Sequence, residues 1–122
     1  MPAYRLSASA EADILAILAY TEEKFGTIAR SRYQALLIAG LRDIAADPNS
    51  RGSASRPELG HDVRTYHLRH SKEHSRSIQG AVARPRHLIL YRVNRHDLIE
   101  VGRVLHDAME IARHLPQQFG DE

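Results

Sequence analysis

Two apolar segments separated by a short polar turn constrain the fold of this chain more than any other feature. Residues 88–93 are almost continuously apolar, and residues 98–105 alternate between apolar and polar side chains as far as Gly102. Runs of this kind predict strands, and the short turn between them makes the two strands antiparallel. The alternation loses its phase at Gly102, so we expect a β-bulge there. A last helix is expected from near Asp107 to Pro116.

The first half of the chain predicts two helices after a short strand at residues 2–6. The first helix is expected over residues 8–25, with Ser7 or Ser9 as its cap, and Gly26 ends it. Thr27 is expected to cap a second helix, which ends near residues 47–48. Apolar side chains recur in both segments at the spacing of one helical face. The link between them is so short that the helices must form an antiparallel hairpin.

The order of these elements indicates one α+β domain over residues 1–122. Residues 63–69 alternate like a third strand, whereas residues 49–57 have the composition of a polar loop. Residues 71–85 are expected to form a long loop or an extended hairpin, and residues 117–122 a loose tail. The predicted sheet is antiparallel and combines the N-terminal strand with a C-terminal three-stranded meander. The helical hairpin must cover one of its faces to bury both apolar stripes.

Composition excludes several classes of protein. The 122 residues suit a single domain, and the absence of cysteine excludes disulfides and thiolate metal sites. No basic leader with a long apolar run opens the chain, and no apolar run approaches the roughly 18 residues of a membrane span. We therefore expect a cytoplasmic protein without a cofactor. His67, His70 and His74 have a spacing that suits metal binding only on a helix, so no metal site is expected.

Charge is distributed unevenly along the chain. Residues 62–106 carry nine basic and four acidic side chains together with six of the eight histidines, whereas residues 107–122 have a net charge of −3. A basic surface attracts phosphates or an acidic protein partner. A solvated charged face accounts for the same pattern, so charge alone does not choose between these interpretations.

Short motifs in these elements resemble those of the RelE/ParE toxins of bacterial toxin–antitoxin modules, and most closely the ParE branch. The resemblance rests on Tyr91 and Arg92 in the first apolar strand, on the closing RVLH segment at residues 103–106, and on YRLS at residues 4–7. It implies a sheet packed by the helical hairpin with the opposite, concave face open. It also implies inhibition of DNA gyrase and neutralisation by a ParD-like antitoxin, whose acidic amphipathic segment wraps the toxin. Residues 71–85 are longer than the usual connection in such chains.

The RelE branch instead cleaves messenger RNA on the ribosome, and most of its pattern is missing here. Leu88 and Asp107 stand where that branch has arginine, and no tyrosine follows Tyr91. The runner-up hypothesis is therefore a ribosome-dependent mRNA interferase that uses His67, Arg69 and His106. A third hypothesis is a divergent member that only binds its antitoxin.

Five side chains are candidates for binding the target or the antitoxin, and we expect no direct nucleic-acid binding and a hetero-oligomer with the antitoxin. Each candidate also has a structural interpretation. Arg92 can pair with Glu100 on the neighbouring strand. Another salt bridge can hold Arg103, and a hydrogen bond can hold His106 in place. Arg64 and Arg69 can belong to a solvated edge of the sheet. Tyr91 is expected in the core. The candidates are Arg64, Arg69, Arg92, Arg103 and His106.

Overall fold

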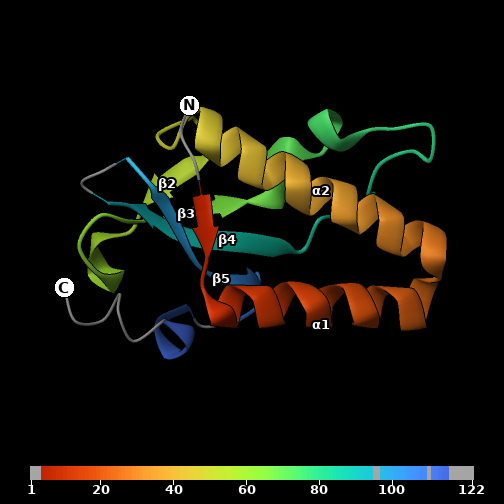
Figure 1. Cartoon of the computed structure of the whole chain (residues 1–122), viewed down its shortest axis with the longest axis horizontal. Helices are drawn as coiled ribbons and strands as arrows, with labels where there is room; N and C mark the ends of the chain where they lie inside the picture. Colours follow the sequence, from red (N-terminus) through yellow and green to blue (C-terminus); the bar gives the residue numbers. More distant parts are fainter. Residues whose placement is uncertain (1–3, 95–96, 110, 116–122) are drawn as a thin grey trace.

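The computed structural model describes residues 4–94, 97–109 and 111–115, which form a five-stranded sheet and a two-helix hairpin (Figure 1). The strands lie in the order β1-β5-β4-β3-β2. Helices α1 (Ala8–Phe25) and α2 (Thr27–Ala46) run antiparallel to each other across one face of the sheet. The strands are β1 (Tyr4–Leu6), β2 (Ser53–Ser55), β3 (Val63–His67), β4 (His87–Val93) and β5 (Ile99–His106).

The helical hairpin confirms the sequence prediction nearly residue for residue. The Ser7 hydroxyl accepts a hydrogen bond from the backbone N–H of Ala10 at 3.0 Å, which caps α1. Gly26 has φ 94, a conformation that glycine adopts without steric strain, so the chain can reverse there within one residue. The predicted cap of the second helix is wrong, because Gly26 takes the cap position of α2 and Thr27 is its first helical residue.

The sheet is mixed rather than antiparallel, which corrects the predicted fold at its first strand. Strand β1 pairs parallel with β5, with Tyr4 opposite Ile99 and Leu6 opposite Val101. Strand β2 was not predicted. It lies inside the expected polar loop and pairs antiparallel with β3. The sequences of β1 and β2 are each three residues long, too short for alternation to reveal pairing or direction.

The predicted bulge at Gly102 is confirmed. Leu90 on β4 lies opposite Arg103, whereas the next residue, Tyr91, lies opposite Val101. Gly102 is the extra residue on β5, and the shift restores the apolar face of that strand toward the helices.

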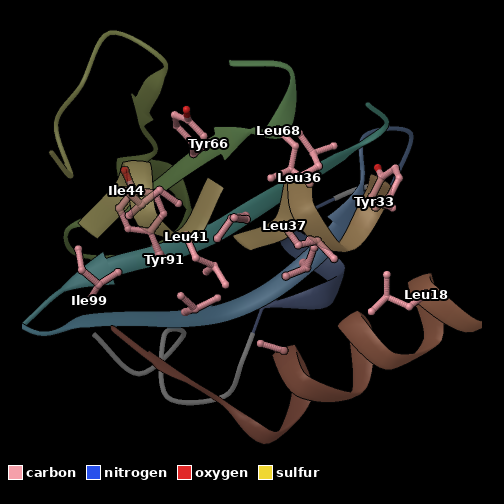
Figure 2. Packing of buried hydrophobic residues seen from close by; sticks show 14 residues of the cluster. Leu18, Tyr33, Leu36, Leu37, Leu41, Ile44, Tyr66, Leu68, Tyr91 and Ile99 are labelled. Atoms are coloured by element: carbon pink, nitrogen blue, oxygen red, sulfur yellow. The ribbon is translucent and has the colours of Figure 1, made fainter. Parts of the chain in front are cut away.

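The main core lies between the helical hairpin and one face of the sheet (Figure 2). Tyr91 is fully buried there, as predicted, beside Leu41 and Ile44 of α2. A second, smaller cluster covers part of the opposite face, where Leu59, Val63 and Leu90 pack with Ile111 and Leu115. The expectation that this face is open is therefore wrong along the part of the sheet that these residues cover.

The end of the third predicted strand also differs from the prediction. Strand β3 ends at His67, and residues 68–71 form the 3-10 turn η2 (Leu68–Ser71) instead of prolonging the strand. The long connection to β4 contains a second 3-10 turn, η3 (Glu73–Ser75), and an isolated bridge between Ser77 and Gly80.

The predicted C-terminal helix is a 3-10 turn, η4 (Ile111–His114), and the expected tail at 117–122 lies outside the described residues. Neither α1 nor α2, the long helices of the described part, has the length and apolarity needed to cross a membrane.

Candidate functional site

Three histidines and an aspartate meet at one end of the sheet. His67 closes β3, His87 opens β4, and His106 closes β5. Because neighbouring strands here are antiparallel, these three positions fall at the same end, and His87 lies directly opposite His106. Asp107 follows His106 immediately. We call His67, His87, His106 and Asp107 the histidine cluster.

Asp107 is the centre of this cluster. One of its carboxylate oxygens lies 3.0 Å from Nε2 of His67, and the other accepts a hydrogen bond from Nη2 of Arg86 at 3.0 Å. Nδ1 of His106 lies 3.6 Å from the second oxygen. The hydrogen bond from His67, with the positive charge of Arg86, lowers the pKa of Asp107. The carboxylate is therefore ionised at neutral pH. It joins the end of β5 to the end of β3 through His67, and to the residue before β4 through Arg86.

The ring nitrogens of His67 are both occupied. Its Nδ1 accepts the backbone N–H of Arg69 at 3.1 Å, and a backbone amide can only donate. The ring proton must then lie on Nε2, where it is donated to Asp107. Nδ1 of His106 is occupied in the same way, because it accepts the backbone N–H of Ala108 at 3.1 Å. Its side chain is 38% exposed, and its Nε2 forms no hydrogen bond with another described residue.

His87 is held neutral inside the structure. The hydroxyl of Tyr33 accepts the backbone N–H of Arg86 and donates its own proton to Nδ1 of His87. Burial raises the pKa of Tyr33, so this hydroxyl keeps its proton. Burial, together with the charge that His106 can carry, lowers the pKa of His87 to about 4. The His87 and His106 rings meet edge to face, with centroids 5.4 Å apart.

Two of the candidate arginines, Arg92 and Arg103, form ion pairs, as expected if their role is structural. Arg92 donates from Nε to Glu100 at 3.0 Å, and Glu100 also binds Arg5 from the parallel strand. Arg103 holds Asp13 of α1 through two hydrogen bonds of 2.7 and 2.8 Å. The hydrogen bond to Asp13 raises the pKa of Arg103. Arg103 therefore joins β5 to the first helix.

Arg64 begins a chain of hydrogen bonds into the core. Its Nε donates to the Ser53 hydroxyl at 2.6 Å, that hydroxyl bonds the Tyr91 hydroxyl, and Tyr91 donates to the carbonyl of Pro48. Arg69, in contrast, is exposed, and its guanidinium forms no ion pair with another described residue.

The structure therefore divides the predicted set among separate places. His67 and His106 meet at Asp107, and Arg69 follows His67 by two residues, whereas Arg64, Arg92 and Arg103 lie in three other hydrogen-bond networks. Sequence reasoning missed four residues of this site. Strand register could have revealed one of them, His87, because it lies opposite His106. The four are Tyr33, Arg86, His87 and Asp107.

No group of three or more histidine, aspartate or glutamate side chains in the described part of the chain, the histidine cluster included, is arranged so that it could hold a metal ion. His67 binds Asp107, whereas His74 binds Asp43 on α2, so these two histidines lie in different networks.

The element order and the motif strands agree with one known family. A family model described as the ParE toxin of the type II toxin–antitoxin system, parDE, matches residues 4–111. The chain belongs to the ParE toxin family. No curated protein matches it. The matched range contains the whole histidine cluster and all five arginine and histidine candidates of the ParE chain, and membership in this family implies an antitoxin as its partner.

Proposed function

We propose that this ParE toxin stops growth by binding DNA gyrase in the cytoplasm, and that a ParD-like antitoxin neutralises it. The proposal includes that the toxin does not cut nucleic acid. The observation that argues against cleavage is that both ring nitrogens of His67 are hydrogen-bonded, Nδ1 to the Arg69 amide and Nε2 to Asp107.

Cleavage of a phosphodiester by attack of the 2′-hydroxyl needs a base, an acid for the leaving group and a cation at the phosphate. His67 can take up a proton on Nδ1 only by giving up the Arg69 amide, so it is a poor base. Asp107 places a negative charge where a cleaved phosphate needs a positive one. Nε2 of His106 is then the accessible imidazole nitrogen of this site, and one such group supports binding better than acid–base catalysis.

The runner-up, a ribosome-dependent mRNA interferase, has one observation in its favour. His67 and His106 do approach the same carboxylate, and Arg69 follows His67 by two residues. On the ribosome, His67 would have to release both the Arg69 amide and Asp107 before it could act as a base beside His106. The two functions can be distinguished by their targets. An interferase cleaves messenger RNA, whereas a gyrase inhibitor leaves it intact.

The surface also suits an acidic amphipathic antitoxin segment. Residues 62–106 carry an excess of basic side chains, which is complementary to an acidic partner. The helical hairpin leaves several large apolar side chains exposed to solvent, where a partner could cover them. They lie along α1 and at the turn into α2: Leu15, Tyr20, Phe25 and Ile28.

Expression in bacteria tests the proposal directly. The ParE chain induced alone should stop growth or accumulate in insoluble form, and co-expression of the antitoxin encoded beside it should restore both growth and solubility. Poisoned cells should contain gyrase trapped on broken chromosomal DNA. Harmless, fully soluble expression of the chain alone would contradict the proposal.

A further inference from the structure

The connection between β3 and β4 is fastened to one face of α2 at two points (Figure 1). At one point, the Asp43 carboxylate accepts a hydrogen bond from Nδ1 of His74 at 2.8 Å. At the other, Nε of Arg32 donates to the carbonyl of Gln79. Arg32 and Asp43 are eleven residues apart, about three helical turns, so both attachments use the same face of the helix. The segment therefore spans the helix lengthwise.

An open hollow of about 390 Å³ lies between this segment and α2. The small side chains of Ala35 and Ala39 leave the space, and His74 and Ser75 form the wall opposite them. Ile38 is 39% exposed at the same place. Five residues of α2 line the hollow: Asp43 and four others that follow the i, i+3, i+4, i+7 spacing of a single face, Ala35, Ile38, Ala39 and Arg42.

The charge available to a ligand in this hollow is positive. Asp43 is already occupied by His74 and by the Ser71 hydroxyl, which donates to it at 2.6 Å. Arg42 is exposed and forms no ion pair with any other residue that the structure describes. An apolar floor beside an unpaired cation is complementary to an apolar side chain with a carboxylate close by.

We propose that this hollow is a recognition pocket for an acidic amphipathic segment of the antitoxin. An apolar side chain of that segment covers Ala35 and Ala39, and a carboxylate pairs with Arg42. The inference rests on the proposed function and adds the place of contact to it. Because the pocket exists only where residues 71–85 fold over α2, it discriminates the cognate antitoxin from one shaped for a toxin without this wall.

The test measures the Kd between the purified chain and the antitoxin encoded beside it. Arg42→Glu reverses the charge at the rim, and Ala35→Trp fills the hollow. Matched controls make the same changes elsewhere, at Arg51→Glu, an exposed position outside the pocket, and at Gln34→Trp, the exposed neighbour on α2. Thermal unfolding of every variant checks the fold.

Both pocket variants should weaken binding about tenfold or more, the loss of a hot-spot contact, while the controls stay within about twofold of the wild type. An antitoxin with a glutamate changed to lysine should regain affinity for Arg42→Glu. Wild-type affinity in the folded Arg42→Glu variant would overturn the pocket and leave the proposed function standing. Failure of the wild-type chain to bind this antitoxin would overturn both.

Discussion

The hydroxyl of Tyr33 on α2 donates a hydrogen bond to Nδ1 of His87 at the start of β4, 54 residues further along the chain. This contact ties the helical hairpin to the end of the sheet that holds the histidine cluster. A hydrogen bond in this direction requires a neutral imidazole, because a protonated Nδ1 cannot accept. The fold and the protonation state of this histidine are therefore linked.

The link predicts that stability falls in mild acid. The pKa of His87 is about 4 in the folded chain and 6.5 as a free side chain, so the unfolded state binds more protons between these values. Its contribution is complete above pH 6.5 and is lost as the pH falls toward 4. We expect a loss of about 2 kcal/mol, after allowing for the solvent that reaches the half-buried ring.

Urea unfolding at a series of pH values measures this loss in the wild type and in His87→Gln. Part of the pH dependence should disappear in the variant and remain in His61→Gln, an exposed histidine on the surface. An unchanged slope in His87→Gln would show that the ring is not the group responsible.

The His106 imidazole distinguishes a binding protein from an enzyme. If the toxin acts by binding gyrase, His106→Ala should retain growth inhibition within a few-fold, because no proton transfer depends on that ring. Loss of an acid or base should cost an enzyme on the order of 10²-fold or more. Growth inhibition is scored against the expressed level of folded toxin, with His61→Ala as the control. A folded His106→Ala variant that is harmless although it still binds gyrase would favour the interferase.

The pair between Arg103 and Asp13 should stabilise the fold more than an exposed pair does. Both side chains are mostly buried, and Asp13 also accepts the backbone N–H of Val104 at 2.9 Å. Arg103→Ala should therefore lower the free energy of unfolding by about 2 kcal/mol, because a carboxylate loses its partner. Arg5→Ala is the control, since Arg5 is 65% exposed and should cost no more than about 0.5 kcal/mol. Denaturant unfolding gives both values, and equal losses would contradict this assignment.

Gly40 marks a close approach between α2 and η2. A methyl group there would lie 2.6 Å from Cδ2 of Leu68, which is fully buried and cannot move away freely. Gly40→Ala should destabilise the protein by about 1–3 kcal/mol from overpacking, even though alanine favours a helix. Ser31→Ala, at an exposed site on the same helix, reports the helix preference alone. A Gly40→Ala variant more stable than the wild type would disprove the close contact.

The sequence predicts the helices well because their boundaries have local causes. Ser7 caps α1 and Gly26 separates the two helices, and both signals lie within a few residues of the effect. The bulge at Gly102 is equally local. The direction of β1 and the existence of β2 depend on partners far along the chain, and three residues hold too little pattern to reveal them.

The candidate site was predictable only in part for the same reason. Residue type points to His67 and His106, whereas their common partner, Asp107, has a charge of the wrong sign for binding phosphate. Its role depends on register, since shifting a strand by one residue turns each side chain to the other face. Tyr33 and His87 meet only once the hairpin is packed on the sheet.

The central claim is that the toxin binds gyrase and leaves phosphodiesters intact, and one paired assay measures it. The purified ParE chain is added to gyrase with relaxed plasmid and ATP, and separately to ribosomes translating a defined message. We predict that supercoiling falls with increasing toxin while the message stays whole. Cleavage of the message with supercoiling unaffected would contradict the account.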